Sequence, residues 1–142
     1  MSTQTNEPDR LAKLLTIGLI SGVIAAAVNV CYMLLYESMT GFSMDKYINV
    51  LSVSISSIVP SVFVGLLYFS LRRIMNWEKA FNSFLLIVVV VSLISFFGPL
   101  SNELPDGSPM PPEFAGLSIP MHIFAPAIYL FMIVRAVPRH QA

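Results

Sequence analysis

The sequence predicts an all-α integral membrane protein, a four-helix bundle that crosses the bilayer up-down-up-down with both termini in the cytoplasm. Three observations support this fold. The 142 residues are 56% hydrophobic and only 11% charged, against roughly 25% charged residues in soluble domains. Every Asp, Glu, Lys and Arg falls outside four apolar spans. The basic residues gather on one side of those spans, which sets the orientation.

The four spans cover residues 14–36, 47–71, 80–102 and 114–134, and together they form one domain over residues 1–142. At about 1.5 Å rise per residue, even the shortest span reaches roughly 30 Å, the thickness of the hydrocarbon core. A charge at mid-span costs about 2.5–3.5 kcal/mol on insertion, which explains why charges are excluded. The first two loops are short, so the first three helices are expected to be antiparallel neighbours, with the fourth returning through a longer loop.

The positive-inside rule orients this bundle. Seven of the eight basic residues lie in the N-terminal segment, the second loop and the C-terminal tail: Arg10, Lys13, Arg72, Arg73, Lys79, Arg135 and Arg139. The first loop contains only Lys46, and the acidic, proline-rich third loop contains no basic residue. We therefore expect the termini and the second loop to face the cytoplasm.

Local signals indicate where the second and third helices begin and where one of them bends. Ser43 is expected to cap the second helix, with Asp45 in its first turn. Asn76 is expected to cap the third helix. Pro60, in the middle of the second span, should kink that helix and leave the carbonyl of Ser56 without its helical donor.

Small residues at four-residue spacing predict a close-packing face on two helices. Gly18 and Gly22 have this spacing in the first span, and Ser57, Ser61 and Gly65 have it in the second. Small residues let helix backbones approach closely, which matters in lipid because hydrophobicity does not drive helix association there. This face packs the first helix on the second, or it forms a homodimer. We favour internal packing, because a polytopic chain needs such faces within itself.

Polar side chains at membrane depth are the candidate functional residues. In the predicted topology they converge on one level in the outer half of the bundle: Asn29, Ser54, Ser57, Ser92, Ser95 and His122. One interpretation is structural, with interhelical hydrogen bonds worth about 0.6 kcal/mol each. The other is a pocket for a ligand or substrate. We favour the structural interpretation, in which Ser92, Ser95 and Asn29 are the partners of His122.

Other chemistries have less support. A Ser–His hydrolase needs a third group to orient the imidazole, and proton-coupled transport usually uses a membrane-embedded carboxylate, but no span contains one. Copper(I) suits thioether, thiolate and imidazole ligands. The outer side offers such groups without a tight spacing between them: Met33, Met39, Met44, Met110, Met121, Cys31 and His122. Scattered basic residues argue against nucleic acid. We predict no catalytic residue, metal or cofactor.

The second half of the chain contains an ordered set of short motifs: Ser92-Leu93, Gly98-Pro99-Leu100, Met121-His122 and, at the end of the last span, Arg135. With four helices in about 140 residues, this order resembles a family of small four-helix bacterial membrane proteins of unknown function. The resemblance implies no activity, but it points to a bacterial cell membrane and to His122, Gly98 and Pro99 as positions to test. The third loop is longer and richer in proline than the family pattern.

Two functional hypotheses follow. The leading one is a non-enzymatic accessory or interaction subunit in the cytoplasmic membrane, in contact with the lipid bilayer and within a homo-oligomer or a larger membrane complex. The alternative is a small transporter, or a carrier of lipid or another small ligand, that uses an outer-half polar pocket around His122. An intramembrane enzyme ranks third. A cavity of about 300 Å³ or more reaching His122 would favour the alternative, whereas tight packing around a hydrogen-bonded His122 would favour the subunit.

Overall fold

The computed structural model describes residues 7–43, 45–101, 103–104 and 106–136. Over these residues it contains four helices and no strand: α1 Glu7–Thr40, α2 Val50–Ile74, α3 Trp77–Ser95 and α4 Pro112–Ala136. Each helix is long and apolar enough to cross a membrane, so the chain is a multi-pass membrane protein. Met44, Asn102 and Arg139, which entered the predictions above, lie outside the described residues.

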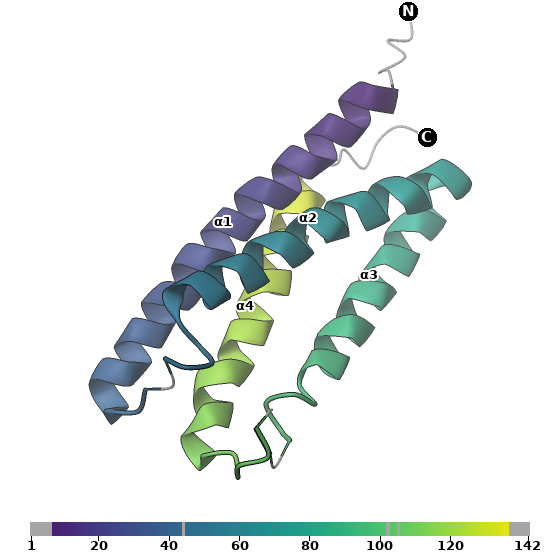
Figure 1. The fold of residues 1–142 in the computed structure, drawn as a ribbon. Coiled ribbons are helices and arrows are strands. Elements are labelled where there is room, and N and C mark those ends of the chain that lie inside the picture. The colour runs from purple at the N-terminus through teal and green to yellow at the C-terminus, as the bar shows by residue number, and fades with distance from the viewer. Residues whose placement is uncertain (1–6, 44, 102, 105, 137–142) are drawn as a thin grey trace, which may run out of the picture.

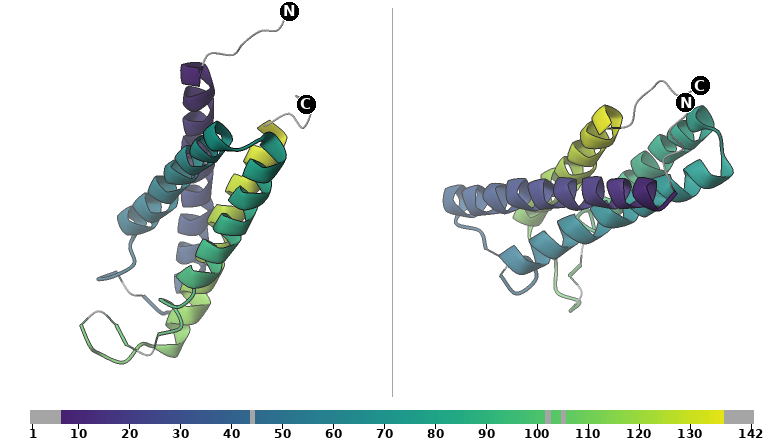
Figure 2. Two further views of the ribbon diagram at one scale, coloured as in Figure 1. Left: turned by 90° about the vertical axis from the view of Figure 1, so that its right-hand side faces the viewer. Right: turned by 90° about the horizontal axis from the view of Figure 1, so that it is seen from above.

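The ends of the four helices lie in two groups, one at each end of the molecule. The start of α1, the turn between α2 and α3, and the end of α4 lie at one end, and the other two loops lie at the opposite end (Figures 1 and 2). The most extensive contacts join α1 to α2, followed by those of α1 with α4. By contrast, α3 and α4 touch sparsely, as do α2 and α4. The helices α2 and α3 meet at their connecting turn and spread apart away from it (Figure 1).

The second helix begins later than predicted. Asn49 caps it, accepting from the backbone N–H of Ser52 (3.0 Å), while the Ser52 hydroxyl accepts from the backbone N–H of Asn49 (2.9 Å). This reciprocal capping box satisfies two donors at once. The prediction that Ser43 caps the helix is therefore wrong, and Asp45 lies in a turn that precedes the helix. The helix covers Val50–Ile74 and contains Pro60.

The third helix begins as predicted and ends early. Asn76 caps it, and the cap is confirmed because its side chain accepts from the backbone N–H of Lys79 (3.0 Å). The third predicted span extends to residue 102, but the helix ends at Ser95 and a series of turns follows. Pro99 explains the early end, because it has no N–H to donate to Ser95 and it disfavours the helical conformation of Gly98 before it.

Two apolar clusters form the core. The larger lies towards the α2–α3 turn: Leu14, Ile17, Tyr68, Leu71, Ala80, Phe84, Val88, Tyr129 and Ile133. The smaller lies towards the other end: Met33, Val53, Leu117 and Met121. Along α1 and α2, buried polar residues lie between these clusters: Ser21, Asn29, Ser57 and Ser61. A polar layer therefore interrupts the apolar core at membrane depth.

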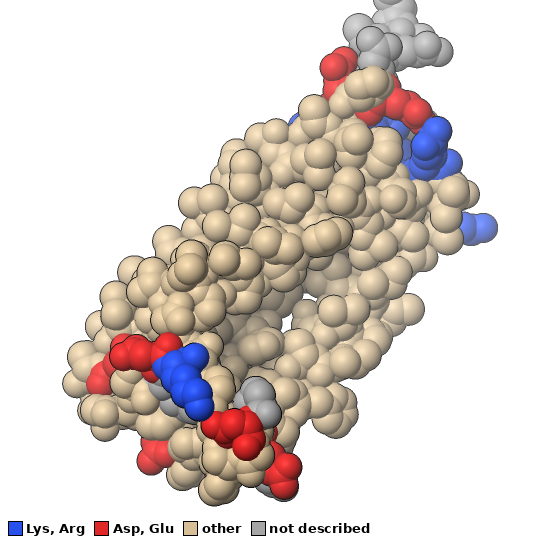
Figure 3. All heavy atoms as spheres, viewed as in Figure 1, with Lys and Arg blue, Asp and Glu red and all other residues tan. Residues whose placement is uncertain are grey.

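The charged side chains of the described residues lie at the two ends of the molecule. Figure 3 shows an uncharged face between them, with most basic residues at the end where the α2–α3 turn lies. Lys46 is the exception, at the opposite and largely acidic end (Figure 3). Exclusion of charge from the middle is what a hydrocarbon environment demands.

Candidate functional site

The predicted small-residue face lies between α1 and α2 of one chain. A Cβ added at Gly18 would lie 2.6 Å from the carbonyl oxygen of Ser61, and one at Gly22 would lie 2.8 Å from the α2 backbone. From the other helix, a Cβ at Gly65 would lie 2.8 Å from the carbonyl oxygen of Leu14. These three glycines are therefore covered within the chain, which is the packing favoured from the sequence.

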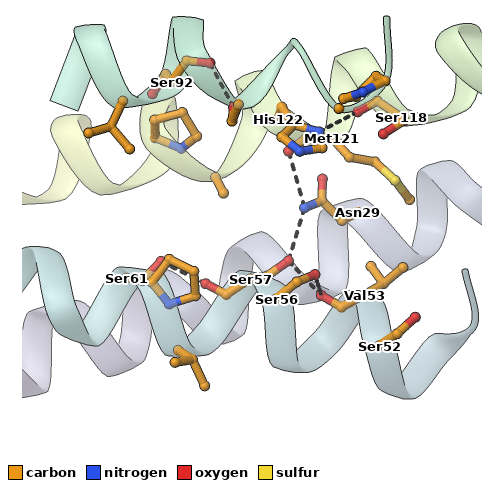
Figure 4. A pocket seen from close by; sticks show the side chains of 18 of the residues that line it. Asn29, Ser52, Val53, Ser56, Ser57, Ser61, Ser92, Ser118, Met121 and His122 are labelled. Carbon is orange, nitrogen blue, oxygen red and sulfur yellow. Dashed lines mark hydrogen bonds between the residues drawn. The ribbon is translucent and has the colours of Figure 1, made fainter. Parts of the chain in front are cut away.

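Asn29 joins three helices within the polar layer. Its Nδ2 donates to the Ser57 hydroxyl on α2 (3.0 Å) and to the carbonyl of Met121 on α4 (3.4 Å) (Figure 4). The side chain is almost completely buried, and its Oδ1 has no hydrogen-bond partner. A buried acceptor without a donor costs about 1–3 kcal/mol. Asn29 therefore both fixes the helices and leaves one polar atom unmatched.

A large cleft adjoins this amide. It has a volume of about 1410 Å³ and is lined by α2, α3, α4 and the third loop, with Asn29 contributed by α1. In the space-filling view the surface is hollowed between α2 and α3 (Figure 3). The cleft exists because α2 and α3 spread apart and few contacts join α4 to either of them. Its volume exceeds the roughly 300–1,000 Å³ that is typical of small-molecule sites.

The cleft has a polar part and an apolar part. The polar part, nearer the first and third loops, is lined by polar groups of all four helices: Asn29, Ser56, Ser57, Ser92, Ser95, Ser118 and His122. The apolar part, nearer the α2–α3 turn, is lined by larger aliphatic and aromatic side chains that include Phe63, Leu67 and Ile87. This division matches the shape of an amphiphile, with a head at one end and a hydrocarbon chain at the other.

His122 lies in the polar part and is half-buried. Its Nδ1 is 2.8 Å from the carbonyl oxygen of Ser118, one turn earlier in α4 (Figure 4). Because a carbonyl can only accept, Nδ1 carries the proton, and in the neutral ring Nε2 has a free lone pair. Ser92 and Ser95 line the same cleft but donate to carbonyls within α3. The ring thus bonds to its own helix rather than to the three partners expected from the sequence.

The structure brings together five of the six predicted polar residues. Asn29 and Ser57 are hydrogen-bonded, and Ser92, Ser95 and His122 line the cleft beside them. Ser54 is the one that does not line the cleft, and its hydroxyl donates to the carbonyl of Val50 (2.7 Å).

Several polar residues that line the cleft were missed as site residues, among them Ser52, Ser56, Ser101 and Ser118, and Ser118 has a sequence signal. Ser118 precedes His122 by four residues, so the two share one face of α4. Ser56 was considered only for its carbonyl, yet its side chain also lines the cleft. A search for serines one turn away from a membrane histidine would have found Ser118.

The groups considered as copper ligands are only partly brought together. Met110, Met121 and His122 line the cleft and Met33 packs with Met121 in the smaller apolar cluster, whereas Cys31 and Met39 are exposed. Within the described ranges, no three His, Cys, Asp or Glu side chains come close enough together to hold a metal ion.

Comparison with known proteins identifies one family. A model described as a family of unknown function (DUF6069) matches residues 9–139. This range includes every residue that lines the cleft and all of the four helices except the first two residues of α1. No curated protein and no solved structure matches the chain.

Proposed function

This chain belongs to that family of unknown function, and from this premise we propose that it binds an amphiphilic lipid in the cleft between α2, α3 and α4. The observation that carries the proposal is a cleft of about 1410 Å³ that reaches His122 and divides into a polar and an apolar part. This supports the lipid or small-ligand carrier over the accessory subunit, because a cavity of about 300 Å³ or more that reaches His122 is what we expect of a carrier.

The position of the opening supports a ligand that comes from the bilayer. Val59, Phe63 and Val91 all line the cleft, and their side chains are also exposed at its edges. Phe63 lies near the middle of α2, and Val91 lies one turn before the end of α3. A ligand that enters between these helices passes through hydrocarbon, which suits a lipid and not a water-soluble metabolite.

The membrane orientation is part of the proposal. We place the start of α1, the α2–α3 turn and the end of α4 on the cytoplasmic side of a bacterial cell membrane, so that the chain crosses up-down-up-down. Of the seven basic residues that the structure describes, Lys46 lies at the other end, where it pairs with Asp106 of the third loop, and six lie at this end: Arg10, Lys13, Arg72, Arg73, Lys79 and Arg135. The polar part of the cleft then lies in the outer leaflet, at the depth of lipid head groups and glycerol.

Binding rather than catalysis is proposed for this site. The ring of His122 donates to the carbonyl of Ser118, and in the hydrogen bonds of the described residues no carboxylate accepts from this ring. A general base that no carboxylate orients lacks one component of the Ser-His-Asp triad.

An accessory subunit is the second candidate. The observation in its favour is the size of the cleft, which exceeds a typical small-molecule site and is open towards lipid. A transmembrane helix from a partner, or from a second copy of this chain, could fill such an opening.

The proposal is tested by blocking the cleft. Ala125 on α4 lines it, whereas Ala127 on the same helix is exposed and does not. The probe is a single-chain lipid with a photoactivatable diazirine in its tail, added to the protein in nanodiscs. We expect cross-links at Phe63, Val91 or other cleft residues, their loss in Ala125→Trp, and their retention in Ala127→Trp. Equal labelling of both variants would show that the probe only coats the surface and would refute lipid binding in the cleft.

A further inference from the structure

The serines of α2 and α3 that line the cleft donate their hydroxyl protons to backbone carbonyls of the preceding turn. Each hydroxyl donates to a backbone carbonyl three or four residues earlier: Ser52 to Asn49 (2.9 Å), Ser56 to Val53 (3.1 Å), Ser57 to Val53 (2.8 Å), Ser61 to Ser57 (2.8 Å), Ser92 to Val88 (2.7 Å) and Ser95 to Ser92 (2.6 Å). A hydroxyl has one proton and two lone pairs. These side chains therefore present acceptors, and not donors, to an occupant of the cleft.

Two prolines add backbone acceptors to the same lining. In a regular helix the N–H of a residue bonds to the carbonyl four residues earlier, and proline has no N–H. Pro60 therefore leaves the carbonyl of Ser56 without its helical donor, and Pro126 does the same for the carbonyl of His122. All four of these residues line the cleft.

His122 and Asn29 add to this excess of hydrogen-bond acceptors over donors. The Nδ1 proton of His122 is taken by the carbonyl of Ser118, so Nε2 of the neutral ring can only accept. Asn29 uses Nδ2 for Ser57 and Met121, which leaves its buried Oδ1 unpartnered beside the polar part. The polar part of the cleft thus presents mainly acceptors, although the lining also includes the hydroxyl of Ser118 and, in the apolar part, the unpartnered hydroxyl of Tyr129, which can still donate.

The formal charges of the lining agree with the hydrogen bonds. Among the described residues that line the cleft there is no Lys or Arg, and Glu103 in the third loop is the one charged side chain. A phosphate or carboxylate head would meet neither a cation nor a set of free N–H donors, which are the groups that bind such anions. An anionic head group is therefore disfavoured at this site.

We infer that the occupant of the cleft is an uncharged amphiphile whose head donates hydrogen bonds, a lipid alcohol such as a monoacylglycerol, and this inference rests on the proposed lipid-binding function. Its hydroxyls donate to the serine oxygens, to the freed carbonyls and to Nε2 of His122, and its hydrocarbon chain lies along the apolar part near Phe63 and Leu67. Lipids whose heads only accept hydrogen bonds, such as simple esters, find no equivalent set of partners.

Three probes with the same oleoyl chain test the head group. Monoolein has two hydroxyl donors, methyl oleate has none, and oleate is an anion. Binding to the full chain in detergent is measured by displacement of the cleft-bound photoactivatable probe. We expect monoolein to bind about tenfold more tightly than methyl oleate, and more tightly than oleate, since its two hydroxyls donate hydrogen bonds that neither of the other probes can form.

Matched serine variants connect the preference to the cleft. Ser56 lines the cleft and Ser54 does not, yet both donate to carbonyls of α2. Ser56→Ala combined with Ser92→Ala should weaken monoolein binding about five- to tenfold and leave methyl oleate unchanged. Ser54→Ala should change neither. Melting temperatures of all variants identify any loss of binding that comes from unfolding, and His122→Phe provides a second variant at the same part of the cleft.

The outcomes distinguish the inference about the head group from the proposal that the cleft binds a lipid. If methyl oleate or oleate binds as tightly as monoolein and Ala125→Trp still abolishes binding, the head-group inference is wrong and lipid binding stands. If no probe binds, or a polypeptide co-purifies in the cleft instead, both are overturned.

Discussion

The hydroxyl of Tyr32 in α1 donates to the carbonyl oxygen of Gly116 in α4 (2.7 Å). Pro120 lies four residues after Gly116 and cannot provide the helical N–H for that carbonyl. The tyrosine replaces the missing donor and joins two helices at the same time. A Cβ added at Gly116 would lie 2.7 Å from the hydroxyl of Tyr36, so the end of that side chain would have to shift.

Removing this hydroxyl should lower stability. Tyr32→Phe leaves the Gly116 carbonyl without this donor, and because the hydrogen bond is exposed the cost is that of one ordinary hydrogen bond, about 0.5–1.5 kcal/mol. Tyr36→Phe is the matched control, because the carbonyl of Glu113 to which Tyr36 donates (2.9 Å) has no proline four residues later. Thermal melting in mild detergent should show a larger decrease for Tyr32→Phe. Equal melting temperatures would mean that the proline-freed carbonyl finds another partner.

The α1–α2 contact should not tolerate one added methyl group. Gly18→Ala places a Cβ 2.6 Å from the backbone oxygen of Ser61, so the helices must move apart, and overpacking of this kind costs about 1–3 kcal/mol. At Gly98 the nearest atom to an added Cβ is 3.7 Å away, so Gly98→Ala should be neutral. The comparison is made by melting and by oligomeric state. A change of oligomeric state without loss of stability would assign Gly18 to a dimer contact instead.

The first and third loops should stay joined at acidic pH. Asp106 accepts from Ser108 (2.6 Å from the hydroxyl), from the hydroxyl of Tyr47 and from Lys46 (3.0 Å). These hydrogen bonds, that of Ser108 first, hold the pKa of Asp106 well below the usual aspartate value of about 3.9. A carboxyl whose pKa is lowered on folding stabilises the fold above its ordinary pKa, and this contribution is lost only as the pH falls through the lowered value.

Hydrogen exchange of the third loop tests this junction. The backbone amides around Ser108 should be equally protected at pH 7 and pH 4 once the intrinsic exchange rates are corrected. Asp106→Asn removes the anionic acceptor and should speed exchange at both pH values. Protection that disappears between pH 7 and pH 4 in the parent protein would contradict the lowered pKa.

The orientation is tested by cysteine accessibility in a Cys31→Ser background. Ser108 lies in the third loop, at the acidic end of the molecule, and Glu78 lies exposed at the other end. A membrane-impermeant maleimide added to intact cells should modify Ser108→Cys and spare Glu78→Cys. Lysed cells, in which both variants should react, provide the control. The reverse pattern would invert the proposed orientation.

The sequence by itself determined the features that depend on the bilayer or on local structure. Charges are excluded from hydrocarbon whatever the helices contact, so all four helices could be located, with the largest differences at the start of α1 (residue 14 against Glu7) and the end of α3 (residue 102 against Ser95). Asn76 could be identified as a cap because capping involves only the next few residues. Where two local solutions competed, local reasoning failed. Asn49 with Ser52 outcompeted Ser43, since a reciprocal capping box satisfies two donors where a single serine satisfies one.

The cleft was decided only by the tertiary structure. In lipid the outward and inward faces of a helix are both apolar, so hydropathy does not indicate which face meets protein. The close approach of Gly18 to Ser61 joins α1 to α2, while α3 leaves α2 after the turn and barely touches α4. That spread places Ser56, Ser92 and His122 around one space instead of in direct contact. The common depth of the polar residues could be predicted from their positions along each helix. Whether these residues contact one another or surround a cleft depends on the angles between the helices, which are set by side-chain packing.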